Sequence, residues 1–181
     1  DANMVVSGLK PHLPGPPISV ELSTQRSPLW VSADAGQLRE ILLTLASPAR
    51  EDAQDRTRLK IGCEPVIVTA TATDIPVPPG RYAKIAVEDD GRGYGPEKSA
   101  VVFESFLAKE GEPTVGADLA RAYAIVREWR GTITFSSHAS QTARRGSVFH
   151  VYLPMSEPER AQGSPTILVV DDEPEIRTLV A

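Results

Sequence analysis

The sequence contains few of the residues that disulfide scaffolds and metal sites require. Its single cysteine, Cys63, excludes an internal disulfide and suits a reducing cytoplasm. Its three histidines, His12, His138 and His150, show no metal-ligand spacing with one another or with Cys63. None of them lies on a helical pattern beside an acidic residue, as a phospho-accepting histidine would. We therefore expect neither a zinc site nor a phosphorylated histidine in this chain.

Positive charge and long apolar runs are equally scarce. Acidic residues outnumber basic ones by 24 to 19, and the net charge of −5 argues against nucleic acid or an anionic membrane as the main partner. No apolar run approaches the roughly 20 residues that span a bilayer. The 181 residues, 41% of them hydrophobic, can bury one core and a fragment of a second. We expect a cytoplasmic chain, and the sequence leaves open whether a longer protein containing it is membrane-anchored.

Hydrophobic periodicity predicts a mixture of strands and helices. Apolar alternation predicts strands at 18–22, 59–61, 66–73, 82–87, 132–136, 147–153 and 167–170. Spacings of three and four predict short helices near 5–9 and 99–106, with a polar connection at 107–115.

Two longer helices are expected between these strands. Asp34 is a predicted N-cap with Gln37 three residues later, an arrangement typical of a capping box. Pro48 lies inside this first helix and removes a hydrogen bond at a cost of about 3 kcal/mol, so a kink or break is expected near Ser47. Gly131 is expected to end the second helix. The predicted apolar faces consist of Leu38, Ile41, Leu42, Leu45 and Ala49 in the first helix, and Leu119, Ala122, Tyr123, Val126 and Trp129 in the second.

The most informative segment follows the strand at 82–87. The strand runs into acidic residues that include Asp89, and Gly91 and Gly93 follow at alternate positions. A carboxylate at a strand end can accept a hydrogen bond from an amino group such as that of adenine, and glycines let a backbone approach a flat ligand closely. The same residues are also ordinary turn chemistry, so the segment alone leaves both interpretations open.

The order of these segments resembles the ATP-binding catalytic domain of sensor histidine kinases over about residues 1–154. The matching segments are Asp89-x-Gly91-x-Gly93, Val102-Phe103-Glu104-Ser105-Phe106, Gly116-x-x-Leu119-Ala120 and the closing stretch from Gly146 to Pro154. The resemblance implies a two-layer α/β sandwich of the Bergerat type, in which helices cover one face of a mixed sheet. It also implies ATP or ADP as ligand, with Mg²⁺.

The resemblance implies a role for each matching residue. Asp89 would bind the adenine amine, with Gly91 and Gly93 shaping the base pocket. Phe103 and Phe106 would lie beside a lid at 107–115, although two buried core phenylalanines would look the same. Lys109 in that lid would reach a phosphate, or it is simply solvated. Gly116 and Leu119 match the phosphate-binding glycine box, where a helix N-terminus attracts anions.

Three positions depart from the family pattern. The family carries two asparagines four residues apart, one of which holds Mg²⁺, and this chain has Thr44 and Pro48 there. Asp118 places a carboxylate where phosphate oxygens would approach, and like charges repel.

Glu40, one turn before Thr44, is a candidate for orienting a water or the attacking group, or it is a solvated glutamate. Arg121 and Arg127 are expected to face water.

The C-terminal segment has a character of its own. Residues 155–165 read as a linker, and 166–181 resemble the start of a response-regulator receiver domain, in which Asp171 and Asp172 would bind Mg²⁺. Without the rest of a receiver, we expect 166–181 to be disordered or packed opportunistically. Because Asp1 is no natural start and Ala181 interrupts an apolar pattern, we expect a piece of a longer protein.

We interpret the chain as part of a hybrid sensor histidine kinase, a phosphotransferase. Its partners would be its own dimerisation and histidine-phosphotransfer helices outside this chain, the receiver, and a second copy in a homodimer. One alternative is a pseudokinase with weakened nucleotide binding that serves as a docking module. The other is a different member of the superfamily, such as a chaperone, mismatch-repair or anti-sigma kinase domain.

Overall fold

The computed structural model describes residues 19–24, 29–51, 58–91, 97, 99–100, 102, 104, 117–138, 146–156 and 166–168. Its elements, in chain order, are β1 (Ser19–Thr24), β2 (Leu29–Val31), α2 (Ala35–Glu51), β3 (Arg58–Val68), β4 (Gly80–Asp89), α4 (Ala117–Glu128), β5 (Thr132–His138), β6 (Gly146–Pro154) and β7 (Thr166–Leu168). The predicted helix at 5–9 and the connection at 107–115 lie outside the described residues. In the segment predicted as a short helix at 99–106, the described positions 99, 100, 102 and 104 are helical, as is position 97.

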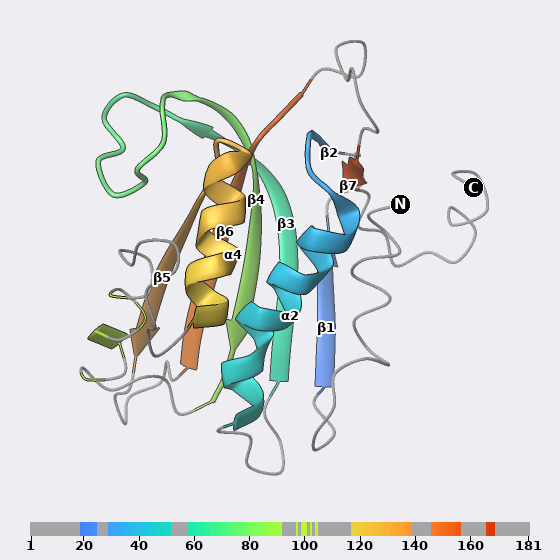
Figure 1. Ribbon diagram of the computed structural model, residues 1–181, viewed down its shortest axis with the longest axis vertical. Helices are drawn as coiled ribbons and strands as arrows, with labels where there is room; N and C mark the ends of the chain where they lie inside the picture. The colour runs from blue at the N-terminus through green and yellow to red at the C-terminus, as the bar shows by residue number, and fades with distance from the viewer. Residues whose placement is uncertain are drawn as a thin grey trace, which may run out of the picture.

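Five strands form one mixed sheet in the order β1-β3-β4-β6-β5. The pairing of β1 with β3 is parallel, and the other three pairings are antiparallel. Helices α2 and α4 lie side by side across one face of this sheet (Figure 1). The predicted α+β fold, with helices on one face of a mixed sheet, is confirmed.

The core lies between the two helices and the facing side of the sheet. Its largest fully buried side chains are Phe149, Leu38, Ile41, Leu42, Leu45, Leu59, Ile61, Ile85 and Leu153. The strands contribute alternate residues because successive side chains point to opposite faces of a sheet. The apolar helix faces predicted from spacing are therefore confirmed, with Ala122 and Val126 buried on α4. The side chain of Ala49 lies outside the described part.

Helix α2 begins where the sequence predicts. The Asp34 carboxylate accepts a hydrogen bond from the Gln37 N–H at 2.8 Å, which satisfies one of the free donors of the first turn. Of the kink or break expected near Ser47, the break is wrong, because the helix continues through Pro48 to Glu51. Pro48 lies in the last turns, so only the N–H that would bond to the Thr44 carbonyl is missing, and few later residues depend on that bond.

Helix α4 ends at Glu128, and the residue that turns the chain after it is Arg130 rather than the predicted Gly131. Arg130 has a left-handed backbone (φ 59°) and donates its N–H to the Arg127 carbonyl at 2.9 Å, while the Gly131 N–H bonds to the Val126 carbonyl at 2.9 Å. This pair of bonds is a Schellman motif. Gly131 is required for another reason, since a Cβ there would overlap the Tyr152 carbonyl oxygen.

The two strands predicted at 59–61 and 66–73 are one continuous strand, β3, followed by a turn from Thr69. Pro65 lies within it, where a sequence pattern argues against a strand. Among the described residues, β1 pairs with β3 as far as Cys63, and the described neighbour of Pro65 is Ala83 of β4.

The described residues of the C-terminal segment pair with β2. Strand β7 pairs antiparallel with β2, with Ile167 opposite Trp30, and forms a second, two-stranded sheet. The predicted strand at 167–170 is therefore present at 166–168, and these three residues have a defined partner rather than none. Asp171 and Asp172 lie outside the described residues.

A loop covers one end of the sheet face opposite the helices. Tyr82, Tyr152 and Val68 are buried beneath residues 69–79, and the Tyr82 hydroxyl donates to the Pro78 carbonyl at 2.8 Å. Arg127 donates from Nη1 to the Pro76 and Gly131 carbonyls, both at 3.3 Å. Arg127 is exposed as predicted, but it also ties this loop to the end of α4.

Candidate functional site

The carboxylate of Asp89 is fixed at the last position of β4. One oxygen, Oδ1, accepts the Gly91 N–H at 2.9 Å, and the other, Oδ2, accepts the Ser147 hydroxyl. Ser147 lies opposite Asp89 in the register of β4 and β6 and is itself buried. Each carboxylate oxygen keeps a further lone pair. The Asp89 carboxylate is therefore an acceptor of fixed orientation that can accept a further hydrogen bond from a ligand.

Gly146 allows this approach of β6 to the end of β4. Its φ is +122°, and a Cβ at this position would overlap the Asp89 carbonyl oxygen. Only glycine adopts such a backbone without strain while leaving that space free. The sequence pattern includes Gly146 and Ser147 in the closing stretch but assigns neither a role. A register prediction that paired Asp89 with Ser147 would have found both.

The second acid of the pair has a structural task. The Asp90 carboxylate accepts the Arg58 N–H at 2.6 Å, and the Asp90 N–H donates to the Arg58 carbonyl at 3.3 Å. These bonds join the end of β4 to the start of β3. Asp90 therefore bonds to β3, whereas Asp89 bonds to Ser147 of β6, the strand on the other side of β4.

The other predicted residues fall into two groups. Gly91 and Leu119 are described: Gly91 bonds to Asp89, and Leu119 is half-buried against the core. The residues Gly93, Phe103, Phe106, Lys109 and Gly116 lie outside the described residues. In the segment around the two phenylalanines, Val102 is helical and buried.

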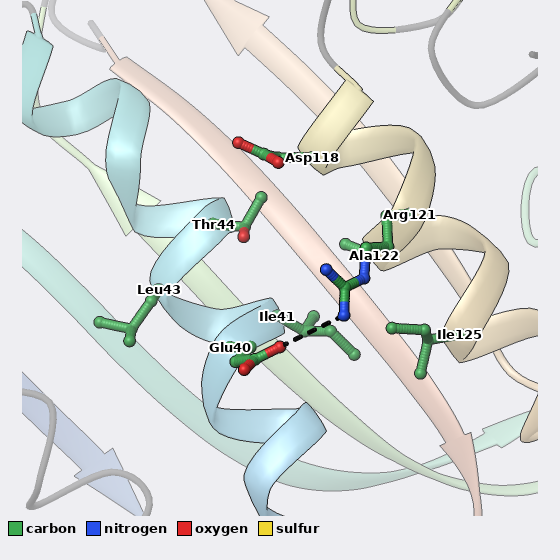
Figure 2. A pocket seen from close by; sticks show the side chains of 8 residues that line it. All are labelled: Glu40, Ile41, Leu43, Thr44, Asp118, Arg121, Ala122 and Ile125. Atoms are coloured by element: carbon green, nitrogen blue, oxygen red, sulfur yellow. Dashed lines mark ion pairs between the residues drawn. The ribbon is translucent and has the colours of Figure 1, made fainter. Parts of the chain in front are cut away.

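A pocket of about 350 Å³ lies between α2 and α4. Its described lining consists of Glu40, Ile41, Leu43, Thr44, Asp118, Arg121, Ala122 and Ile125 (Figure 2). Figure 1 shows that β4 ends at the same end of the sheet at which α2 ends and α4 begins. The structure therefore places three residues singled out in the sequence, Glu40, Thr44 and Asp118, around one pocket between α2 and α4.

The charges in this pocket are two acids and one base. Arg121 Nη2 lies 3.9 Å from Glu40 Oε2, at the outer limit of an ion pair. The Arg121 and Glu40 side chains are 73% and 67% exposed, so water screens the attraction and the pair contributes little to stability. Arg121, predicted to face water, is exposed but also spans the gap between the helices.

The residues present do not fit the Mg²⁺ that the family pattern implies. Of the two asparagine positions, Thr44 supplies only a hydroxyl and Pro48 supplies no side-chain ligand. A guanidinium, that of Arg121, lies in the same pocket and engages Glu40. Across the described ranges, no group of three or more His, Cys, Asp or Glu side chains could hold a metal ion. Neither do these ranges contain a helix long and apolar enough to cross a membrane.

Comparison with known proteins gives three kinds of match. A family model described as histidine kinase-, DNA gyrase B-, and HSP90-like ATPase matches residues 33–157. The sensor kinase CckA of Brucella abortus (strain 2308) is 27% identical over 189 aligned positions, which cover 92% of this chain and 20% of that protein. This chain thus spans about a fifth of that relative.

Solved structures share the fold. A mycobacterial sensor histidine kinase, MprB, superposes with a TM-score of 0.57 at 19% identity, covering 85% of this chain and 93% of that one. Full-length ShkA, solved in complex with AMPPNP, superposes with a TM-score of 0.57 at 21% identity, covering 86% of this chain and 29% of that one. At these identities the likeness establishes the arrangement of strands and helices.

Proposed function

The chain belongs to the histidine kinase-, DNA gyrase B- and HSP90-like ATPase family, and we propose that it is the ATP-binding catalytic module of a hybrid sensor histidine kinase. The observation that carries the proposal is the fixed carboxylate of Asp89. It lies at the strand end where the family pattern expects the adenine contact, and it retains acceptor capacity. The relative CckA is named a sensor kinase, which supports the same assignment.

In this proposal the chain positions ATP and a partner supplies the acceptor. Asp89 accepts the adenine amine, and Gly91, through its N–H, and Ser147, through its hydroxyl, hold the carboxylate in place. The phosphate tail would extend toward the pocket between α2 and α4. Phosphoryl transfer depends mainly on positioning and charge neutralisation. The γ-phosphoryl group would pass to a histidine on the dimerisation helices of the whole protein, in a cytoplasmic homodimer.

The hybrid assignment rests on the segment after the family match. Asp171 and Asp172 follow β7 as an acidic pair follows the first strand of a receiver, where carboxylates bind Mg²⁺. A histidine-to-aspartate relay within one protein would then follow autophosphorylation. We propose 1–154 as the nucleotide domain, 155–165 as a linker and 166–181 as the receiver start.

A second candidate is a pseudokinase that keeps the fold and binds nucleotide weakly. The pocket favours it, because Glu40 and Asp118 present two carboxylates near the expected phosphate path. Thr44 provides only a weak metal ligand. In this role the domain would dock or stabilise a dimer rather than transfer a phosphoryl group.

The test is calorimetric titration with ADP and a non-hydrolysable ATP analogue, with and without Mg²⁺. We expect micromolar binding that Asp89→Asn abolishes. Glu88→Gln is the matched control, because Glu88 is the exposed neighbour whose side chain points to the other face of the sheet. If folded protein gives no heat at millimolar nucleotide, the catalytic assignment fails and the pseudokinase is the better description.

A further inference from the structure

We propose that Arg121 binds the phosphate groups of the nucleotide, so that this chain takes a nucleoside diphosphate or triphosphate without a divalent metal. The inference deepens the proposed function and rests on it. The family pattern implies Mg²⁺. The pocket between α2 and α4 instead contains the guanidinium of Arg121 and lacks the asparagine ligands.

The position of Arg121 suits this role. It lies one turn after Asp118 near the start of α4, and its guanidinium extends across the gap toward Glu40 of α2 (Figure 2). It is the one cation among the described residues that line the pocket. Figure 2 shows its guanidinium lying over the gap between the helices, on the side that faces α2.

The guanidinium is held over the pocket without being committed to one partner. Its ion pair with Glu40 is long, at 3.9 Å, and both side chains are mostly exposed. Exchanging such a pair for a phosphate therefore costs little. A guanidinium has five N–H donors in a planar fork that matches phosphate oxygens, so it can neutralise charge and fix orientation together.

The surrounding acids set the strength of this contact. Glu40 competes with a phosphate for Arg121, and Asp118 repels the same phosphate. Removing the Glu40 charge should therefore tighten nucleotide binding, although the substitution breaks an ion pair visible in the structure. A residue that only braced α2 against α4 would not produce this gain.

The experiment compares adenosine with ADP by calorimetry, in EDTA and in Mg²⁺. For the unchanged chain we expect ADP to bind more tightly than adenosine in EDTA, with less than about a threefold change on adding Mg²⁺. Arg121→Gln should weaken ADP binding at least about tenfold and leave adenosine binding unchanged, because a lost charge-assisted bond affects only the phosphorylated ligand. Arg121→Lys should retain part of the ADP affinity.

Two further variants complete the design. Glu40→Gln should strengthen ADP binding several-fold, and Arg81→Gln, at the exposed far end of β4, controls for the loss of one positive charge. If Arg121→Gln leaves ADP affinity intact, the role of Arg121 is refuted while adenine binding stands, and if Mg²⁺ raises ADP affinity more than about threefold, metal-independent binding is refuted. If ADP binds no more tightly than adenosine, the phosphate contact is likewise refuted. If neither ligand binds, the proposed function and this inference fail together.

Discussion

The two ends of the candidate site differ in how firmly the fold builds them. At the Asp89 end, both carboxylate oxygens have buried or backbone donors, and Gly146 fits against the backbone of Asp89. At the helix end, Glu40 and Arg121 are exposed and joined by one long ion pair. An acceptor whose hydrogen-bond donors belong to the sheet is held in place by the fold itself. Surface residues on two helices can change without disturbing the core.

The largest effect is expected from Gly146→Ala. The new Cβ would overlap the Asp89 carbonyl oxygen, and the residue would keep a left-handed φ, so we expect a loss of about 3 kcal/mol of unfolding free energy in urea titrations. Gly80→Ala, at the other end of β4, meets only an ordinary contact at 3.4 Å with Tyr82 and should change stability far less. Equal losses in the two variants would contradict the special role of Gly146.

The next effect concerns the donor to Asp89. Ser147→Ala removes a buried hydroxyl and leaves Asp89 Oδ2 without that bond, so adenosine affinity should fall about tenfold, together with about 1–2 kcal/mol of stability. Ser136→Ala, at an exposed position of neighbouring β5, is the matched control. Should adenosine bind equally well to both variants, Asp89 does not need its partner to recognise the base.

A smaller change in ADP affinity is expected from a substitution in the pocket between α2 and α4. Asp118→Asn removes a negative charge from the pocket between α2 and α4 and should raise ADP affinity about threefold to tenfold, with adenosine affinity unchanged. Titration calorimetry at low ionic strength measures both. Glu128→Gln, at the exposed far end of α4, carries the same charge change as a control. A gain for adenosine as well would mean that the substitution alters the base pocket.

The smallest effect is the pH dependence of stability at His150. Burial lowers the pKa of His150, Lys84 lowers it further, and Glu88 and Glu64 partly oppose the shift. A lowered pKa means that the unfolded chain binds the proton more readily, so stability should decrease as the pH falls below about 6.5. Urea midpoints between pH 7.5 and 5.5 should show this decrease, and His150→Gln should reduce it. An identical decrease in both proteins would assign it to other groups.

Local sequence rules succeed where one segment decides the outcome. The Asp34 cap, the apolar faces of α2 and α4 and the strand that ends at Asp89 all follow from spacing and side-chain chemistry. They fail where a neighbouring segment decides. Pro65 lies within β3, where the described residues of β1 pair only as far as Cys63. Gly131 is required by the nearby Tyr152 carbonyl, while Arg130 adopts the left-handed conformation after α4.

Residue type and local spacing alone indicate the order of strands and helices and the acidic residues at the end of the strand before Gly91. The resemblance to sensor histidine kinases supplied the class of fold and the two asparagine positions that Thr44 and Pro48 occupy here. Only the tertiary structure decided that Ser147 holds the Asp89 carboxylate, and that Arg121 and Glu40 meet across one pocket. The reason is that these partners are 58 and 81 residues apart in the chain, and strand register and helix packing bring them together.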